Sequence, residues 1–330
     1  MRKVFSTYER MQVDWRRPHL GASEIGGPCA RALWFTFRWA TARRKAGRML
    51  RLLERGKREE LWLASDLRSA GLELYTVDPT TRAQVRVSFH GGHFGGSMDG
   101  IVRRVPQAPE AWHVFEAKTT NAKDFKELLK HGVAKAKPEH WAQVQVYMHG
   151  LAELGIDRAL YLSVCKDDDY VYEERVRYDA AAAAWFVERA RRAVFDASPP
   201  PKISDDPDWF QCRFCPHHRT CQDDAVAEVN CRTCLSSTAM PDGTWRCEHL
   251  GRVLNVAEQK AACEAHLFHP ALVPWEQIDA GERFVEYRRA DGEVIRNGQG
   301  GVSSRDLHQW TSNKTSNTEE TVGSTTTHAR

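Results

Sequence analysis

The chain has 330 residues, of which 42% are hydrophobic and 28% are charged. This length is enough for one large core and a satellite domain, and the composition is ordinary for a soluble globular protein. No run approaches the roughly 18 uncharged apolar residues that would predict a membrane span, and the N-terminus lacks the apolar segment of a signal peptide. We therefore expect a cytoplasmic protein.

The net charge of +3 hides an uneven distribution. Residues 1–60 carry 15 Lys and Arg against 6 Asp and Glu, a balance of +9, and the remaining 270 residues carry 32 against 38, a balance of −6. A basic N-terminal segment suits contact with a polyanion, although it also suits the solvated face of a helix.

The residue pattern predicts regular structure up to residue 196. Ser23 is expected to cap the first helix, and Gly71 is expected to end the second. In chain order, the expected elements are helices over 19–40 and 44–70, strands over 72–77, 84–90, 97–103 and 112–119, helices over 121–131 and 138–154, a hairpin over 158–166 and 169–177, and a helix over 179–196.

A proline run at 199–201 indicates a boundary. It is followed by two cysteine-rich stretches, 209–221 and 230–269, with little predicted regular structure. Residues 275–308 are expected to add a small hairpin that turns at Asp291-Gly292. From about 309 the chain is rich in Thr, Ser and Asn and is expected to be disordered.

Two of the predicted strands carry side chains that suit a metal centre. Glu116 and Lys118 lie two apart in an alternating run, so they point to the same face. Asp99 lies in the preceding predicted strand; if the two strands are neighbours, two carboxylates and one amine meet. Two carboxylates hold a hard divalent cation, and a nearby ammonium can hold a phosphate or a water beside it. The pattern predicts a centre that cuts phosphodiesters.

Helical residues are expected to complete this centre. The helix over 44–70 carries several acids, and Glu60 follows Gly56, which allows close backbone approach; the same acids also suit a solvated helix face. Gln143 and Tyr147 are four apart and share a face, where they can donate hydrogen bonds to a phosphate or a base. An ordinary helix–sheet contact would also account for this pair.

The order Glu60, Asp99, Glu116-x-Lys118 and Gln143-x-x-x-Tyr147 resembles the PD-(D/E)xK nuclease superfamily. Within it, the chain is most similar to RecB-like exonucleases, including the phage lambda-type enzyme and the iron–sulfur nucleases associated with CRISPR adaptation and AddB. Met98 stands where the motif has proline. An acid at Glu60 matches lambda-type members, whereas many RecB-like members have histidine there. The resemblance covers roughly residues 20–225.

The resemblance implies an α/β fold with a restriction-endonuclease-like core, in which helices flank a central mixed β-sheet. Asp99 and Glu116, supported by Glu60, would bind one or two Mg²⁺ or Mn²⁺ ions. Lys118 would position the attacking water and help to deprotonate it, with its pKa lowered by partial burial near the metal. Gln143 and Tyr147 would orient the DNA strand. The implied role is a DNA exonuclease of phage or prophage recombination or repair, acting with a single-strand annealing protein; a homo-oligomer remains open.

Eight of the nine cysteines fall in two groups with metal-like spacing. Because no export signal is seen, we expect metal ligands rather than disulfides. The first group joins Cys29 to Cys212-x2-Cys215-x5-Cys221, and in iron–sulfur relatives this arrangement implies a [4Fe–4S] cluster that closes the nuclease domain, here 1–225. Tetrahedral zinc is the alternative, with His217 or His218 in place of Cys29.

The second group is Cys231-x2-Cys234-x12-Cys247 followed by Cys263-x2-His266. This spacing predicts a zinc-ribbon-like C-terminal domain over 226–308, ahead of a disordered tail over 309–330. The four cysteines are the expected ligands, and His266 and His249 are rivals for the fourth place. The ribbon would stabilise a segment without a core of its own, or contact DNA or a partner. The ninth cysteine, Cys165, is expected in the core.

The basic segment is the expected DNA contact. We expect its cations to neutralise phosphates and its interleaved aromatic residues to pack in the core rather than stack on bases. The cations are Arg31, Arg38, Arg43, Arg44, Lys45, Arg48, Arg51, Arg55, Lys57 and Arg58, and the aromatics are Trp34, Phe35, Phe37 and Trp39.

Two alternatives to the exonuclease remain: a non-catalytic DNA-binding or scaffold protein on the same fold, and a CRISPR-adaptation-type or RNA nuclease.

Overall fold

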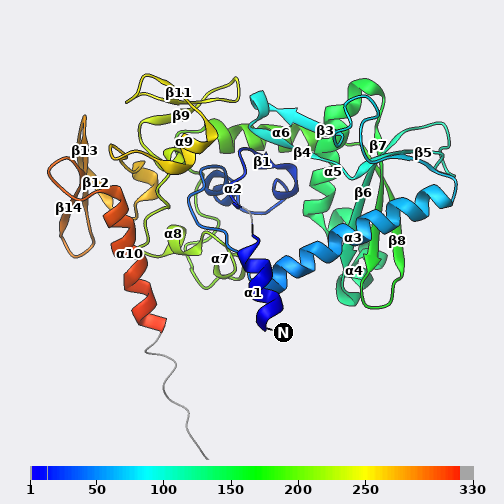
Figure 1. The fold of residues 1–330 in the computed structure, drawn as a ribbon, viewed down its shortest axis with the longest axis horizontal. Helices are drawn as coiled ribbons and strands as arrows, with labels where there is room; N and C mark the ends of the chain where they lie inside the picture. The colour runs from blue at the N-terminus through cyan, green and yellow to red at the C-terminus, as the bar shows by residue number, and fades with distance from the viewer. Residues whose placement is uncertain (1, 13, 320–330) are drawn as a thin grey trace, which may run out of the picture. The chain divides into compact units, whose positions relative to one another are not determined.

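The structure is a computed structural model that describes residues 2–12 and 14–319 (Figure 1). Two compact units share the chain. The first consists of the residues up to Pro28 together with Arg44–Val194, and the second consists of Cys29–Arg43 together with the residues from Phe195 onwards. Among the helices described, none is long and apolar enough to cross a membrane.

A five-stranded mixed sheet forms the centre of the first unit. Strands β6 and β7 are parallel, and each other neighbouring pair is antiparallel. The predicted α/β architecture with a central mixed sheet is confirmed. In spatial order, the strands are β2 (Glu73–Tyr75), β5 (Gly100–Arg103), β6 (His113–Thr120), β7 (Arg158–Cys165) and β8 (Val171–Arg177).

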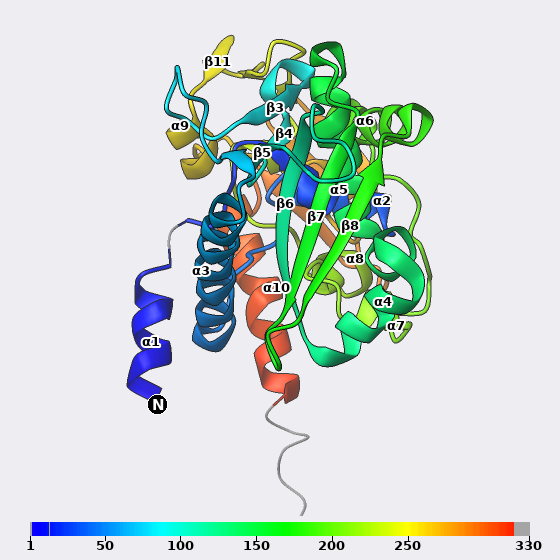
Figure 2. The same cartoon turned by 90° about the vertical axis from the view of Figure 1, so that its right-hand side faces the viewer.

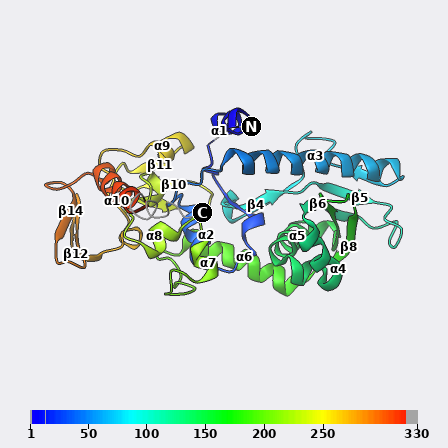
Figure 3. The same ribbon diagram turned by 90° about the horizontal axis from the view of Figure 1, so that it is seen from below.

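Helices cover both faces of this sheet. Figures 2 and 3 show α3 (Gly47–Ser69) on one side of the strands and α4 (Ala122–Ala136) with α5 (Pro138–Leu151) on the other. Residues alternate between the faces of a strand. Phe115 and Ala117 of β6 therefore pack with Leu63 of α3 in one apolar cluster. Glu116, which lies between them in the strand, points to the opposite face, which α5 covers.

Two expected elements differ from the structure. The helix expected over 19–40 is confined to α2 (Ala30–Phe37), because Gly26-Gly27-Pro28 interrupts it, and Ser23 lies in a short 3₁₀ turn, Ala22–Glu24. The strand expected over 97–103 is divided at Met98-Asp99 into β4 (Phe94–Ser97) and β5. Strand β4 leaves the main sheet and pairs with β1 (Leu20–Gly21) and β3 (Arg86–Phe89).

Other expected elements are confirmed. Helix α3 ends before Gly71, whose φ of +88° suits a glycine at a helix terminus. Helix α6 (Ala180–Phe195) and the β7–β8 hairpin lie where predicted. Helix α4 is longer than predicted and bends at Gly132, where φ is +72°. A further helix that the pattern did not predict, α1 (Arg2–Arg10), packs against α3.

The second unit has its own apolar core, which explains why residues 29–43 belong to it. Trp34 and Phe35 of α2 are buried among Phe268, Leu272 and Tyr287. The further elements of this unit are α7 (Phe210–Arg213), α8 (His218–Gln222), β9 (Ser237–Ala239), β10 (Trp245–Cys247), β11 (Arg252–Leu254), α9 (Val256–Ala261), β12 (Glu276–Gly281), β13 (Phe284–Arg288), β14 (Val294–Gly298) and α10 (Ser304–Glu319).

The C-terminal elements extend the predictions. The expected hairpin is a three-stranded sheet, β12-β13-β14, and Asp291-Gly292 lies in its last turn. The disorder expected from residue 309 is wrong as far as Glu319, because α10 continues through it; residues 320–330 lie outside the described part of the chain. The expected functional boundary at 225 stays a prediction, and compactness alone places 195–225 with the C-terminal residues.

Candidate active site

Glu116 and Lys118 lie side by side on β6, on the face that α5 covers. The Lys118 ammonium donates to Glu116 Oε1. The second carboxylate oxygen, Oε2, is buried and has no hydrogen-bond partner. An uncompensated carboxylate oxygen in a buried place is costly unless a ligand or cation satisfies it.

Asp99 reaches the same place from the bend between two strands. It lies at the bend between β4 and β5, and its Oδ2 accepts a hydrogen bond of 2.8 Å from the Ala117 N–H. Strand β5 pairs with β6 so that Gly100 lies opposite Phe115. The bend, rather than a continuous strand, therefore brings the Asp99 carboxylate beside Glu116 and Lys118.

The electrostatics of these three groups are tightly coupled. Burial raises the pKa of Glu116 to about 8, although the neighbouring Lys118 charge opposes the shift. Burial also raises the pKa of Asp99, again against Lys118. For Lys118, burial would lower the pKa, but the surrounding carboxylates of Glu116, Asp99 and Glu60 outweigh it, and the pKa is raised. The lowering of the Lys118 pKa that is expected beside a bound metal stays a prediction.

Among the three acids considered on α3, Glu60 is the one that faces the centre. Its pKa is raised by burial and then by Asp99, while Lys118 lowers it, so Glu60 lies within electrostatic range of both. Glu59 instead pairs with Arg55 at 3.5 Å, and Glu54 pairs with Lys57 at 3.7 Å.

Gln143 and Tyr147 form a hydrogen-bonded chain that ends on the polypeptide. Gln143 Nε2 donates to the Tyr147 hydroxyl, and this hydroxyl donates to the Ser97 carbonyl oxygen, each over 2.8 Å. Gly96 permits this approach, because a Cβ there would lie 3.0 Å from the hydroxyl. The Tyr147 hydroxyl is thus engaged within the protein, and it fixes the backbone two residues before Asp99 rather than being free for DNA.

Two further residues, His140 and Tyr161, adjoin the centre and were missed from the sequence. His140 Nδ1 lies 2.8 Å from the Tyr161 hydroxyl, and burial followed by the Lys118 charge lowers the pKa of His140 to about 3. Tyr161 lies opposite Glu116 in the β6–β7 register. The helical spacing of His140 three residues before Gln143 was the available signal.

The residues present suit a divalent cation. The unpartnered Glu116 oxygen and the Asp99 carboxylate supply hard oxygen donors, which Mg²⁺ and Mn²⁺ prefer. Within residues 2–12 and 14–319, no group of three or more His, Cys, Asp or Glu side chains is arranged so that it could hold a metal ion, either at the acids or at the cysteines.

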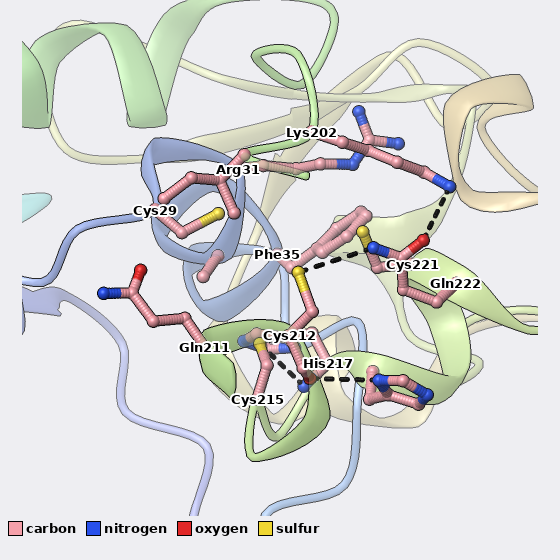
Figure 4. Close-up of a pocket in the computed structure, with 13 residues that line it drawn as sticks. Cys29, Arg31, Phe35, Lys202, Gln211, Cys212, Cys215, His217, Cys221 and Gln222 are labelled. Atoms are coloured by element: carbon pink, nitrogen blue, oxygen red, sulfur yellow. Dashed lines mark hydrogen bonds between the residues drawn. The ribbon is translucent and has the colours of Figure 1, made fainter. Parts of the chain in front are cut away.

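The first cysteine group lines one pocket of the second unit. Figure 4 shows Cys29, Cys212, Cys215 and Cys221 around it. Burial raises the pKa of Cys215, and the other three thiols raise it further, so the four sulfurs are electrostatic neighbours. All four remain free of disulfides.

His217 and His218 also line the pocket but are poor substitutes for Cys29. Both ring nitrogens of His217 lie within hydrogen-bonding distance of threonine hydroxyls, Thr36 at 2.9 Å and Thr41 at 3.1 Å. His218 Nδ1 lies 3.0 Å from the Cys212 carbonyl oxygen. Both ring nitrogens of His217 and one of His218 are thus engaged within the protein.

The groups around the first cysteines are cationic or hydrogen-bond donors. Arg31 and Lys202 lower the pKa of the Cys221 thiol against the larger effect of burial. Gln222 Nε2 lies 3.5 Å from Cys212 Sγ, and the His217 N–H lies 3.4 Å from Cys215 Sγ. Such donors stabilise thiolates, the form that binds a metal or cluster.

The second cysteine group lines another pocket of the same unit. Cys231, Cys234, Cys247 and Cys263 all contribute to its wall. Burial raises the pKa of Cys231 to about 12, and the other three thiols add to the shift. A small apolar cluster beside the β9–β11 sheet contains Cys231, Cys247 and Leu254.

The histidine rivals in the second group differ in their surroundings. His266 is buried, and its Nε2 lies 3.1 Å from the Asn230 carbonyl oxygen, whereas its Nδ1 is buried without a partner. His249 lines the same pocket. The four cysteines stay our expected ligands because each of the other three thiols raises the pKa of Cys231.

The basic segment divides between buried and exposed residues. Trp34, Phe35, Phe37 and Trp39 are 0–2% exposed, which confirms the prediction that they pack in a core. Arg38 is also buried, and its guanidinium lies 3.8 Å from the centre of the Trp34 ring. The expectation that Arg38 contacts DNA is therefore wrong. The cations of the basic segment that are exposed are Arg44, Lys45, Arg48, Arg51, Arg55, Lys57 and Arg58.

Comparisons with known proteins identify the family. The structure is similar to an alkaline exonuclease from Laribacter hongkongensis, with 20% identity over 58% of this chain and 90% of that chain and a TM-score of 0.35, and to SSO0001, with 14% identity over 67% and 92% and a TM-score of 0.37. No curated protein matches the sequence. The profile of the PD-(D/E)XK nuclease superfamily matches residues 6–222. The chain therefore belongs to the PD-(D/E)XK nuclease superfamily.

Proposed function

We propose that this protein is a DNA exonuclease that depends on Mg²⁺ or Mn²⁺. The observation that carries the proposal is the buried Glu116 carboxylate, which has one oxygen on Lys118, the other without a partner, and the Asp99 carboxylate in its electrostatic field. Nucleases of the PD-(D/E)XK superfamily need such a pair of hard oxygen donors next to an amine.

Asp99 and Glu116 would hold the cation, with Glu60 in support from α3. When bound, the cation would polarise the scissile phosphate and stabilise the leaving oxygen. The Ala117 N–H orients Asp99 by its 2.8 Å hydrogen bond. Tyr147 fixes Ser97 and thereby the bend that carries Asp99. These contacts pre-organise the acids, which saves the cost of ordering them when substrate binds.

Lys118 would act as a hydrogen-bond donor to the attacking water or to a phosphate oxygen. Its raised pKa in the metal-free protein supports an ammonium at neutral pH. With Glu116 and Asp99 holding a cation, Lys118 would lose its proton to solvent more readily, and the neutral amine could then accept a proton from the water. Gln143 retains its carbonyl oxygen for contacts near the strand.

The cysteine groups would be structural. We propose a [4Fe–4S] cluster at Cys29, Cys212, Cys215 and Cys221, supported by their shared pocket and its cationic rim. We propose zinc at Cys231, Cys234, Cys247 and Cys263, supported by their shared pocket and by the mutual effect of the four thiols on the pKa of Cys231.

The biological setting would be phage-type DNA recombination or repair, with a single-strand annealing protein as partner. Family resemblance supports this setting, and so does the set of exposed cations on α3, which suits a DNA backbone. The module over 1–225 would carry the nuclease, and the module over 226–308 would carry the zinc.

Incubation of end-labelled linear DNA and circular DNA with the wild-type protein tests the proposal. With Mg²⁺ or Mn²⁺ we expect loss of linear DNA from its ends and no cut in the circle, and EDTA should stop the reaction. Cutting of the circle would show an endonuclease instead. If neither substrate is cut with either metal, the proposed activity is wrong.

A further inference from the structure

Helix α4 carries a row of exposed lysines directly after the strand of the active site. It begins at Ala122, two residues after the end of β6. Lys123, Lys126 and Lys130 are exposed, and their spacing places them within about 60° of one another around the helix axis at 3.6 residues per turn. We call these three residues the α4 lysine row.

The row is not neutralised by the protein. Among the described residues, none of the three lysines is paired with a carboxylate. Of the two acids of the same helix, Asp124 pairs with Lys137 at 2.7 Å, and Glu127 lies 3.6 Å from His131, an ion pair only when this histidine is protonated.

Carboxylates from the elements that pack against α4 are also engaged. The Glu174 carboxylate of β8 accepts from the Val133 N–H at 2.7 Å and from the Tyr172 hydroxyl at 2.5 Å. Asp167, in the β7–β8 turn, accepts from the Ala122 N–H at 2.8 Å. The three exposed ammonium groups are therefore open to solvent, where they can attract a polyanion.

The length of the row suits a nucleic-acid strand. Lys123 and Lys130 are seven residues apart, about 10 Å along a helix, which matches the rise of about three nucleotides of one strand. Lys123 lies only five positions after Lys118 in the chain. The row thus continues from the candidate active site along the outside of α4.

We infer that the α4 lysine row binds the phosphate backbone of DNA outside the active site, on the part of the substrate that is not being cut. This surface rests on the proposed function for the choice of DNA as its partner. It would hold long substrates by charge alone, without reading sequence, and would not take part in the cleavage step.

The test is the salt dependence of DNA binding, measured in EDTA with a long single-stranded oligonucleotide. Glutamine keeps the helix propensity of lysine but removes its charge. The Lys123→Gln/Lys126→Gln/Lys130→Gln variant should reduce the slope of log K against log salt by about 2, at about 0.7 per lost phosphate contact. Replacement of the same three lysines by arginine should preserve the slope.

A matched control removes three exposed cations from the second unit: Arg246→Gln/Arg283→Gln/Arg288→Gln. It changes net charge equally and should leave the slope near the wild-type value. An unchanged slope in the lysine variant, or an equal fall in the control, would overturn the inference.

A small substrate separates this inference from the proposed activity. Hydrolysis of bis(p-nitrophenyl) phosphate with Mn²⁺ needs only the active site, so the lysine variant should match wild type. If wild type cuts neither this ester nor DNA, the proposed activity fails, whereas the binding slope in EDTA still decides whether the row contacts DNA.

Discussion

The Tyr147 hydroxyl donates a 2.8 Å hydrogen bond to the Ser97 carbonyl oxygen, two residues before Asp99. This contact joins α5 to the bend that carries a metal-binding acid. Tyr147→Phe should leave the Ser97 oxygen without its partner and loosen Asp99. We expect Mn²⁺ affinity to fall by about 10-fold or more, as for other groups that orient metal ligands, measured by calorimetric titration.

Tyr178→Phe is the matched control for this variant. The Tyr178 hydroxyl lies 2.7 Å from His149 Nδ1, also on α5, so its loss removes one hydrogen bond to the same helix. Both variants should lose about 1 kcal/mol or more of stability. Only Tyr147→Phe should weaken Mn²⁺ binding; equal Mn²⁺ affinity in the two variants would remove the positioning role of Tyr147.

Metal affinity should rise with pH up to about 8. Burial raises the pKa of Glu116 to about 8, so below that value a proton occupies the carboxylate that the cation needs. Each unit of pH below 8 should therefore cost up to about tenfold in Mn²⁺ affinity, because bound metal releases that proton. Titrations between pH 6 and 9 measure this, and an affinity independent of pH in that window would contradict it.

Lys118→Ala should abolish cleavage and leave DNA binding within a few fold of wild type. The variant loses the amine proposed to hold the attacking water. In the wild-type protein the Lys118 charge lowers the pKa of Glu116, so the loss of this charge should raise that pKa further. Gel-based cleavage and anisotropy binding assays check both expectations. Lys135→Ala, at an exposed lysine of α4 outside the lysine row, serves as the control and should still cleave; retained cleavage by Lys118→Ala would remove this assignment.

Cys29→Ser should strip the first cysteine site of its cluster. Anaerobically purified wild type is expected to contain iron and show the broad visible absorption of a [4Fe–4S] centre. Cys165→Ser is the control, because Cys165 lies buried in β7, outside both groups. A colourless wild-type preparation with stoichiometric zinc at this site would show that the assignment to iron is wrong.

Much of the first unit follows from sequence pattern. The alternation from His113 to Thr120 predicts a strand with Glu116 and Lys118 on one face, and the structure places them so. The helix over 44–70 was recognisable from its apolar spacing and from Gly71. These elements obey local rules of periodicity and termination, which one sequence contains.

What the sequence could not predict depends on contacts between distant residues. Residues 97–103 resemble one strand, yet β4 ends at Ser97 and pairs with β1 and β3, which leaves Asp99 at a bend. The direction of the Tyr147 hydroxyl depends on how closely Gly96 approaches it. The raised pKa of Lys118 depends on three carboxylates from three separate elements, a sum that no local pattern reveals.

Glu116→Gln tests the central claim most directly, because glutamine keeps the shape of the side chain and removes the charge that binds the cation. Cleavage of end-labelled linear DNA with Mg²⁺ should be lost in this variant, together with saturable Mn²⁺ binding, while DNA binding in EDTA persists. Cleavage by Glu116→Gln at the wild-type rate would contradict the assignment of Glu116 and Asp99 as the metal-binding centre.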